Sequence, residues 1–558
     1  MYRRRRPRQA NCFIPGTLSD YIPEDHILKQ LDKVLDLSWL AEEVKGLYTE
    51  RTGRPCIDPE QAVRLMLAGF LHGVVHDRKL MREAQVNIAY RWFAGYELDE
   101  ELPDHSSLTR IRQRWGEERF RQIFERSVTQ CAEAGLVAGE LVHVDASLVR
   151  ADVSWGSLVR AHVSRVLEEN EVVAQHPPGE DPPGEDPPGE HPPGEDPPGE
   201  DPPGEDPPGE DPPGEDDPPS PPVGKASAPP ADKPAIRTAL QDPEGSRQGP
   251  RGAGKPAIRP AGKLKKVSTT DPDASMATGS RRHRLEPSYK QHTAVDDTAG
   301  VIVDVHVTTG EANEGQQLLG QLARVAQRTG VLPGAVTADR GYASSGNYAA
   351  LEELEVEAVI PPQPDCSPHR GLPLQRFAYD ARHDVVVCPT GKRLCRKART
   401  ANGWFYRARA ADCQECPLKE RCLSPTARSR SVCIKDGYCA LLRARRRKQR
   451  GWPGSTVDAY RRHRWRVEGI HGEAKSQHGL RRAVRRGLSN MRIQAYLTAA
   501  VVNLKRLAIH ASRVLAQWLY RTWYRSVRLM VGDLVPRLAI ARRTPVPQVI
   551  LTTTPDHA

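Results

Sequence analysis

The sequence lacks several features that mark common functional classes. Its 558 residues contain no apolar run long enough to span a bilayer, which argues against a membrane-spanning helix. The basic start MYRRRRPRQ is not followed by the apolar segment that a secretion signal requires. No Walker-type glycine loop for phosphate binding occurs. We therefore expect an intracellular, cytoplasmic chain with no membrane partner.

Disulfide bonds are not expected either, because cysteines in a reducing compartment are free thiols or metal ligands. Four of the eleven cysteines lie near one another in the chain: Cys388, the Cys413-x-x-Cys416 pair and Cys422. This set resembles a structural Zn²⁺ site, although its spacing is not a standard one. Zinc is favoured over unligated thiols, with Cys395 as an alternate ligand or a bystander. A redox disulfide is least favoured, since no thioredoxin-like context surrounds the pair.

Positive charge is in excess. Lys and Arg outnumber Asp and Glu by ten, and sixteen acids but no Lys or Arg lie within residues 177–219. The rest of the chain therefore carries a formal charge of +26. A surplus of this size points to a polyanionic partner, most simply nucleic acid.

The acidic segment is a simple repeat. From Pro177 the pentapeptide PPGED occurs eight times, with His191 in place of one aspartate. The period is too short for a solenoid, and a Pro- and Gly-rich segment without apolar residues cannot form a packed core. We expect a disordered insert that continues through a Pro/Ala/Lys-rich stretch to about Lys266. An expanded, tolerated insertion is favoured over a self-masking role in which these acids compete with DNA.

The first part of the chain, from about residue 20 to residue 135, is expected to be all helical. Asp58-Pro59 is typical of a helix start, with a carboxylate at the N-cap and proline at the first helical position.

A second helix start is expected at Ser106 or Ser107, and this helix displays Arg110 and Arg114 one turn apart. Two short helices, the second of them basic, are compatible with a helix-turn-helix in a DNA groove. Simple packing in a helical bundle is the alternative.

Two aspartates follow short predicted strands. Leu141–Asp145 is an apolar run that ends in an acid, and the strand Ala335–Ala338 is followed by Asp339 and a glycine turn. The alternating order of strands and helices predicts a mixed α/β sheet with helices against it, and sites in such sheets form outside strand ends. An ordinary turn aspartate is the alternative reading. The other predicted elements are a β-hairpin at 290–307 that turns at Thr298-Ala299-Gly300, a helix at 313–329, a strand at Glu357–Pro362 and a helix at Asn490–His510 capped by Ser489.

A third acid lies on a later helix, RWRVEGIHGEAKSQH. At about 100° per residue, one face of an α-helix here carries Glu468 between cations. A carboxylate flanked by cations suits a site that holds a divalent metal and grips a phosphate backbone. A solvated, salt-bridged face is the alternative. Glu473 is a rival acid, but it lies about 140° around the helix from Glu468. The residues on the predicted face are Arg464, Glu468, His471, Lys475 and His478.

Together, Asp145, Asp339 and Glu468 can hold two Mg²⁺ ions, or Mn²⁺ in their place. Mg²⁺ prefers oxygen ligands, and paired ions of this kind assist in-line attack on a phosphate.

These motifs resemble the DDE transposases of bacterial insertion sequences. Arg464, Glu468 and Lys475 match the last three positions of the Tyr-x-x-Arg-x-x-x-Glu-x-x-x-x-x-x-Lys signature of one branch, whereas Arg461 stands at the tyrosine position with Tyr460 adjacent. VDASLVRAD resembles the first-aspartate strand of the family and ADRGY its second-aspartate motif. STTDPDA with the following hairpin, the N-terminal helical region and the cysteine-bearing insertion also resemble family segments.

The resemblance implies a ribonuclease H-like core. It also implies Mg²⁺-dependent strand cleavage at terminal inverted repeats, followed by strand transfer into target DNA by the freed 3′-hydroxyl. Arg464 and Lys475 would contact DNA near the scissile phosphate, and the N-terminal helices would help to recognise the ends. A homodimer or higher multimer would hold two ends together at the bacterial nucleoid. The alternatives are an inactive or nicking-only relic and a zinc-containing DNA-binding regulator.

The expected domains follow from these motifs. They are a helical DNA-end-binding region (1–137), the first core part (138–174), the disordered insert (175–266), the second core part (267–365), a cysteine-rich insertion (366–450), the catalytic helix with C-terminal core helices (451–512) and a basic tail (513–558).

Deleting residues 177–219 is expected to leave the core folded and DNA cleavage in place, because the repeat offers nothing to a packed core. Far-UV circular dichroism and a cleavage assay on the deleted protein test this. Lost structure would show that the repeat contributes to the fold.

Overall fold

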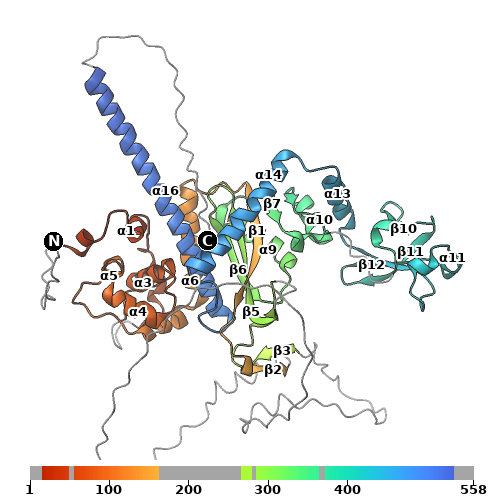
Figure 1. Ribbon diagram of the computed structural model, residues 1–558, viewed down its shortest axis with the longest axis horizontal. Helices are drawn as coiled ribbons and strands as arrows, with labels where there is room; N and C mark the ends of the chain where they lie inside the picture. The colour runs from red at the N-terminus through yellow and green to blue at the C-terminus, as the bar shows by residue number, and fades with distance from the viewer. Residues whose placement is uncertain (1–15, 50–55, 162–264, 280–283, 364–370, 533–558) are drawn as a thin grey trace, which may run out of the picture. The chain divides into compact units, whose positions relative to one another are not determined.

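The computed structural model describes residues 16–49, 56–161, 265–279, 284–363 and 371–532 (Figure 1). The predicted PPGED repeat lies outside the described residues, as does the end of the predicted basic tail. The described residues form two units, one made of residues up to Val153 together with those from Asp273 onward, the other of Ser154–Pro272. In the smaller unit, η2 (Trp155–Ser157) leads into β2 (Leu158–Ala161), which pairs antiparallel with β3 (Lys265–Ser268).

The described N-terminal residues are all helical between Leu18 and Glu133, as predicted. Asp58 caps its helix by accepting bonds from the backbone N–H groups of Glu60 and Gln61, which confirms that start. The second cap was predicted two or three residues too late: the side chain of Asp104, rather than that of Ser106 or Ser107, accepts the N-terminal bond. The helices are η1 (Leu18–Tyr21), α1 (Ile27–Asp32), α2 (Leu40–Lys45), α3 (Pro59–Leu71), α4 (Asp77–Val86), α5 (Ile88–Ala94) and α6 (His105–Glu133), the last broken at Gly116, whose φ is 67°.

A mixed sheet forms the centre of the larger unit. From one edge its order is β6-β5-β1-β7-β8, with β4 also paired to the start of β5. The hairpin partners β5 and β6 run antiparallel, β1 runs antiparallel to β5, and β7 and β8 run parallel to β1. This is the ribonuclease H-like mixed sheet expected from the resemblance. The strands are β1 (Leu141–Arg150), β4 (Ser275–Ala277), β5 (Glu286–Asp296), β6 (Ile302–Thr309), β7 (Ala335–Ala338) and β8 (Glu357–Val359).

Two strand ends differ from the predictions. The first strand does not end at Asp145 but continues to Arg150, because its antiparallel ladder with β5 pairs every residue from Val142 to Arg150. The last strand stops at Val359 rather than at Pro362, where the two prolines have no N–H to donate to a ladder. The hairpin turn and the strand Ala335–Ala338 lie where they were predicted.

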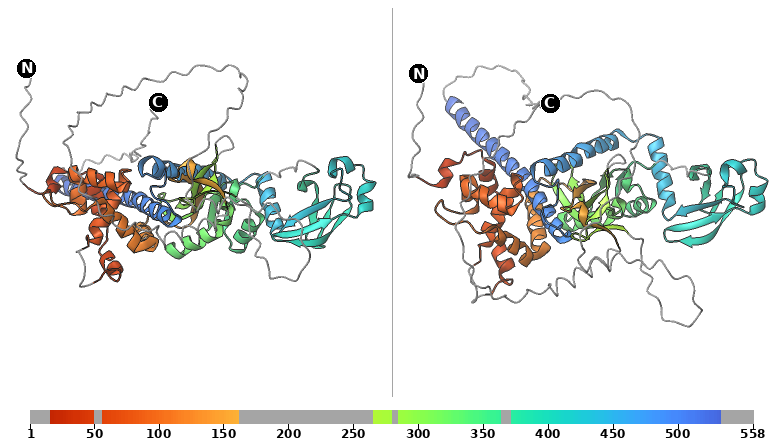
Figure 2. Two further views of the ribbon diagram at one scale, coloured as in Figure 1. Left: turned by 90° about the horizontal axis from the view of Figure 1, so that it is seen from below. Right: turned by 60° about the horizontal axis from the view of Figure 1, so that its bottom comes forward.

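Helices cover both faces of this sheet. Four helical elements connect strands of the sheet along the chain: η3 (Glu314–Gln316), α9 (Leu318–Thr329), η4 (Arg340–Tyr342) and α10 (Ser345–Glu353). After them, α14 (Gly454–His463), η6 (Arg464–Glu468) and α15 (Gly469–Gln477) follow one another. Figure 2 shows these later helices, in blue, on the side of the sheet opposite to α9, in green.

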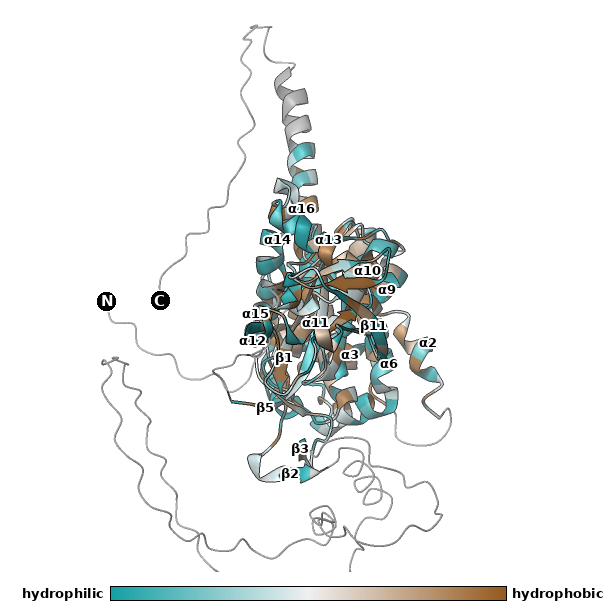
Figure 3. Ribbon diagram, turned by 90° about the vertical axis from the view of Figure 1, so that its right-hand side faces the viewer, coloured by the Kyte–Doolittle hydropathy of each residue, from teal (hydrophilic) through white to brown (hydrophobic). Residues whose placement is uncertain are grey.

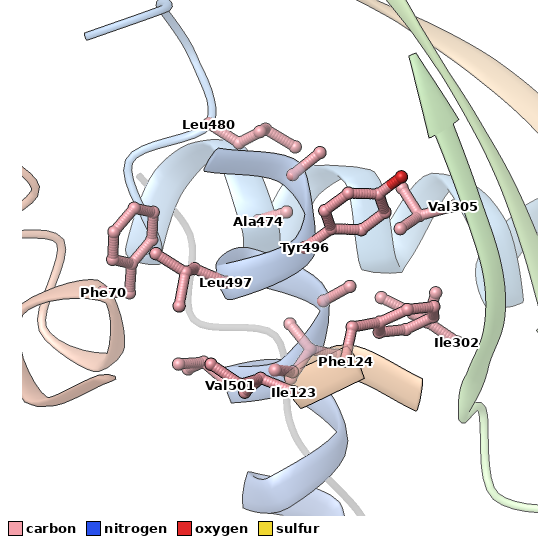
Figure 4. Packing of buried hydrophobic residues seen from close by; sticks show 14 of the residues in the cluster. Phe70, Ile123, Phe124, Ile302, Val305, Ala474, Leu480, Tyr496, Leu497 and Val501 are labelled. Atoms are coloured by element: carbon pink, nitrogen blue, oxygen red, sulfur yellow. The ribbon is translucent and has the colours of Figure 1, made fainter. Parts of the chain in front are cut away.

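The core is one continuous cluster of apolar side chains. Leu497 and Val501 of α16 (Leu488–Gly532) meet Phe124 of α6, Ile302 of β6 and Phe70 of α3 (Figure 4). Side chains from the N-terminal helices and from the sheet are thus buried together, so the helical region shares its core with the sheet.

The helix α16 is longer at both ends than predicted. It begins at Leu488, so Ser489 lies inside it rather than at its N-cap, and it runs to Gly532 into the predicted basic tail. Within the core, the Asn503 side chain bonds to both backbone groups of Ile302 on the edge strand (2.8 and 2.9 Å). Its outer turns carry polar and apolar residues side by side (Figure 3), and Trp518 is one of its exposed apolar residues. None of the helices in the described part of the chain is apolar over a sufficient length to cross a membrane.

The cysteine-rich module, residues 371–437, has its own five-stranded antiparallel sheet in the order β13-β12-β11-β10-β9. Its core is small: seven of its apolar residues are buried, together with Tyr438, which directly follows the module. Helix α13 (Tyr438–Gln449) leads from it to α14. The elements of the module are η5 (Leu374–Arg376), β9 (Ala378–Asp380), β10 (Val385–Val387), β11 (Arg393–Thr400), β12 (Gly403–Arg407), α11 (Ala410–Gln414), α12 (Lys419–Cys422) and β13 (Ser431–Lys435).

Candidate active site

Asp145 and Asp339 lie side by side because of the strand register. In the parallel ladder of β1 and β7, Val144 pairs with Ala338, so each aspartate directly follows one partner of the last pair. Asp145 itself pairs across the other ladder with Thr293. Although Asp145 lies inside its strand, it is therefore beyond the end of the parallel ladder, where β7 has already ended.

Glu468 ends a π-helical turn in the helix that covers this face. The segment Arg464–Glu468 is π-helical, between α14 and α15. The prediction of a regular α-helix is wrong here, because an i→i+5 turn rotates less per residue than an α-helical one. Glu468 is 63% exposed and accepts a bond from Nε of Arg464, which is 83% exposed (3.2 Å). Turns of this kind are frequent at functional sites.

The residues predicted to share one face of the Glu468 helix differ in their exposure to solvent. Arg464 and Glu468 are exposed, whereas His471 and His478 are buried. His478 Nδ1 lies 3.0 Å from the carbonyl oxygen of Phe70, so it fills the interface with α3. Both imidazoles are buried, so neither is exposed on the surface of the helix as Arg464 and Glu468 are.

His471 and Lys475 surround Asp145 from the helix side. His471 Nε2 lies 3.1 Å from Thr293 Oγ1, and its Nδ1 lies 3.7 Å from the Asp145 carboxylate. Burial and the charge of Lys475 lower the pKa of His471 to about 3, so this imidazole is neutral. Lys475 is itself partly buried, which lowers its pKa, and the charge of Asp145 opposes that shift.

Glu473 is engaged elsewhere on the same helix. Its carboxylate pairs with Lys505 Nζ (2.9 Å) and Arg506 Nη2 (3.2 Å) of α16. It therefore anchors α15 to α16, in agreement with its position far around the helix from Glu468.

Negative charge is crowded around Asp145. Burial, together with the charges of Asp339, Glu314 and Glu468, raises the pKa of Asp145 to about 7. Burial and the charge of Glu314 also raise the pKa of Asp339. The charges of three neighbouring carboxylates therefore act on Asp145, the most strongly shifted of these acids.

Glu314 is the member of this group that sequence reasoning missed. It lies in η3, within a segment read only as helix, and its carboxylate pairs with Lys290 Nζ (2.9 Å). No motif in the sequence marks it; only the folding of η3 against η4 brings it to the aspartates. An inward-facing lysine on β5, Lys290, is the one signal that could have suggested an acidic partner.

A buried polar network fixes the helix to the sheet beside the acids. Thr337 Oγ1 of β7 lies 2.6 Å from His143 Nδ1 of β1 and 2.8 Å from His463 Nδ1 of α14. The network continues from His143 Nε2 to the Asp297 carboxylate, which lies 3.0 Å away. This carboxylate also accepts a hydrogen bond from Nε of Arg462 (3.0 Å). Since residues two apart on a strand share a face, this network lies on the same face as Asp145 and Asp339.

Tyr460, rather than Arg461, faces the acids. Burial and the charges of Asp339 and Asp145 raise the pKa of Tyr460, whereas Arg461 is exposed and pairs with Asp458 (3.3 Å).

The donor set suits a hard divalent cation. Crowded carboxylates are the ligands that Mg²⁺ prefers, and a cation would relieve their repulsion. Tyr342 Oη is buried beside these acids and has no hydrogen-bond partner within the described residues, as expected where a cation or its water belongs. As the side chains stand, no three acids, histidines or cysteines of the described residues are arranged to hold an ion, and Glu468 is turned towards Arg464.

The remaining predicted site residues lie apart from the acids in the chain. Arg110 and Arg114 are both exposed on α6, and the Arg114 guanidinium stacks over the Tyr48 ring (4.7 Å). Their DNA contact stays a prediction. The four predicted zinc ligands line one cavity of the cysteine-rich module: Cys388, Cys413, Cys416 and Cys422.

Two family models match the chain. One, described as Transposase domain (DUF772), matches residues 16–114, and the other, described as Transposase DDE domain, matches residues 265–504. The first match covers most of the N-terminal helices, and the second runs from β3 into α16 and includes Asp339 and Glu468. A comparison with curated protein sequences gave no match. Since the two matches together cover more than half of the sequence and the sheet has the expected topology, the chain belongs to the DDE transposases of insertion sequences.

Proposed function

We propose that this transposase cleaves DNA strands at the terminal inverted repeats of an insertion sequence and transfers the freed 3′-hydroxyl ends into target DNA. The observation that carries the proposal is the register of β1 and β7, which sets Asp145 beside Asp339 under the helix that bears Glu468. Asp145, Asp339 and Glu468 are the catalytic acids of this proposal.

These three acids would hold divalent cations: two Mg²⁺ ions, or Mn²⁺ in their place. Such ions, when bound, activate an attacking oxygen and stabilise the leaving oxygen of an in-line displacement at phosphorus. The chain's own contribution is positioning. The Thr337 network and the Arg462–Asp297 pair hold the end of α14 against the sheet, directly before the turn that bears Glu468.

The cations beside the acids can bind the phosphates of the DNA backbone. Arg464 is exposed on the turn that ends in Glu468, and a guanidinium can bind a phosphate through two parallel hydrogen bonds. Lys475 lies partly buried next to Asp145, where an ammonium group would pair with a phosphate that enters the site. Arg110 and Arg114 of α6 are proposed to contact the DNA ends.

Joining two ends of one element needs two active sites. We therefore expect a homodimer or a higher multimer on DNA, acting at the nucleoid. The outer turns of α16 and the basic residues beyond them are a candidate region for that assembly.

The test is an in-vitro strand-transfer assay with the purified chain, linear DNA bearing the element's inverted repeats, a target plasmid and Mg²⁺. The proposal predicts both cleaved ends and joined products. Cleaved ends without joined products would identify a nicking-only relic, and binding without either product would identify a DNA-binding regulator.

Replacing Arg464 by alanine is expected to weaken DNA binding and to lower the slope of log K against log salt by about 1. The reason is that one fewer phosphate is neutralised, and the exposed bond from Arg464 to Glu468 contributes little to stability. Fluorescence anisotropy at several salt concentrations measures the slope. Arg382→Ala, at an exposed position after β9, is the matched control, and an equal change in both variants would contradict the contact.

A further inference from the structure

A small cavity in the cysteine-rich module is lined by four cysteine side chains. Cys388 follows β10, Cys413 lies in α11, Cys416 lies in the turn after it, and Cys422 ends α12. The cavity has a volume of about 30 Å³, which is the space of one water molecule or one ion. Cysteines up to 34 positions apart in the chain thus line one cavity.

Hydrogen-bonding groups and positive charge lie around the cysteine sulfurs of the cavity. The backbone N–H of Lys392 donates to Cys388 Sγ (3.3 Å), and Thr390 Oγ1 lies 3.1 Å from Cys388 Sγ and 3.8 Å from Cys416 Sγ. Such donors orient metal-bound sulfur and stabilise its charge. The cavity is also lined by three cations, Lys392, Lys419 and Arg430, against a single acid, Asp412.

The positive charge around the cavity suits a zinc ion bound by four thiolates. Four thiolates around one Zn²⁺ carry a net charge of −2, which the net charge of +2 from the three cations and Asp412 offsets. Thiolate ligands in a tetrahedral set select zinc over harder ions such as Mg²⁺. The site is therefore distinct in chemistry from the carboxylates on the central sheet.

The module has a structural need for a cross-link. Its apolar core holds only seven buried residues of its own and Tyr438, and modules of this size usually depend on a metal or on disulfides. All nine cysteines of the described residues are unbridged. The segment from Ala408 to Arg430, which contains α11 and α12, has short helices and no strand to hold it to the sheet.

We propose that Cys388, Cys413, Cys416 and Cys422 bind one structural Zn²⁺ ion that holds α11 and α12 to the sheet of the module. Four S–H bonds lose their protons to solvent as four Zn–S bonds form, with no change in oxidation state. As the side chains stand, no three ligands of the described residues are arranged for an ion, so binding draws the sulfurs towards the centre of the cavity. Cys395 is exposed on β11 and does not line the cavity, so it is a bystander.

Metal analysis of the purified full-length protein, without added metal or DNA, tests the proposal. About one zinc ion per chain is expected, together with the absorption of tetrahedral thiolate coordination after exchange for Co²⁺. Cys413→Ser and Cys416→Ser are each expected to lose the zinc, whereas the controls Cys395→Ser and Cys433→Ser keep it. A native protein without zinc, or zinc retained in both cavity variants, would overturn the site.

A count of reactive thiols keeps the test decisive if the cavity variants fail to fold. In the native protein, a chelator is expected to release zinc and to expose four additional thiols to a thiol reagent. Release of zinc with no newly reactive thiols would show a surface-bound ion and would refute the proposal. Since neither measurement uses DNA, the zinc site and the proposed strand transfer can fail independently of each other.

Discussion

Replacing Asp145 or Asp339 by asparagine, or Glu468 by glutamine, is expected to lower DNA cleavage by at least about 10³-fold while leaving DNA binding nearly intact. Each change removes a charged oxygen ligand without changing the size of the side chain. A bound divalent ion contributes several kcal/mol of transition-state stabilisation, and each factor of ten in rate corresponds to about 1.4 kcal/mol. Binding persists because it depends on the surrounding cations rather than on the acids.

Cleavage of end-labelled DNA and fluorescence anisotropy measure the two properties separately. Asp458→Asn is the matched control, because Asp458 is an exposed acid on α14, one element before the turn that carries Glu468. Its cleavage rate is expected to stay within a factor of two or so, as for other exposed surface changes. If one of the three variants cleaves as fast as this control, that residue is not a catalytic acid.

Replacing Asp77 by asparagine is expected to destabilise the N-terminal region by about 3–5 kcal/mol. Asp77 starts α4 and accepts two bonds from Arg112 of α6 (2.7 and 2.9 Å), and it also pairs with Arg485, which follows α15. Both Asp77 and Arg112 are buried, so the substitution would leave two cations close together without their counter-charge. The cluster also joins the N-terminal helices to the segment after the catalytic helix.

Urea unfolding followed by far-UV circular dichroism measures this effect. Glu42→Gln, which breaks an exposed pair with Lys45, is the control and is expected to change stability by less than about 1 kcal/mol. An equal shift in both variants would show that the Asp77 cluster contributes no more than a surface pair.

The stability from Asp77 also depends on pH. Burial alone would raise its pKa, but the charges and hydrogen bonds of Arg112 and Arg485 hold the pKa below the ordinary value of 3.8. A carboxylate with a lowered folded-state pKa contributes fully above its unfolded pKa and loses its contribution as the pH falls through the folded one. The difference between wild type and Asp77→Asn is therefore expected to be constant above about pH 5 and to shrink below pH 4.

Most of the sheet could be predicted because its strands are short apolar runs between clear turn signals. Ala335–Ala338 ends at an acid and a glycine turn, and the structure has the strand at those residues. Asp145 was placed at a strand end because a polar residue interrupts the apolar run. The strand continues because its partner β5 offers a ladder as far as Ser288, and no local pattern reports the length of a distant partner.

The geometry of the helix that carries Glu468 could not be predicted from α-helical spacing alone. An α-helical spacing was assumed for Arg464–His478, but the π-helical turn changes the rotation at the residue that matters most. The turn is stabilised by tertiary contacts, since Val467 is buried and Arg466 approaches Asp297 (3.6 Å). Likewise, Glu314 reaches the acids only through the packing of two short helical turns, so no spacing in the sequence could have identified it.

The measurement that most directly tests the acids as one metal site is a change of metal requirement in Asp145→Cys. A thiolate is a poor ligand for Mg²⁺ and a better one for Mn²⁺. We expect this variant to bind DNA normally, to cleave no DNA ends in Mg²⁺ and to regain cleavage in Mn²⁺. Undiminished cleavage in Mg²⁺, or no cleavage in either ion by a folded, DNA-binding variant, would contradict the assignment of Asp145 as a metal ligand.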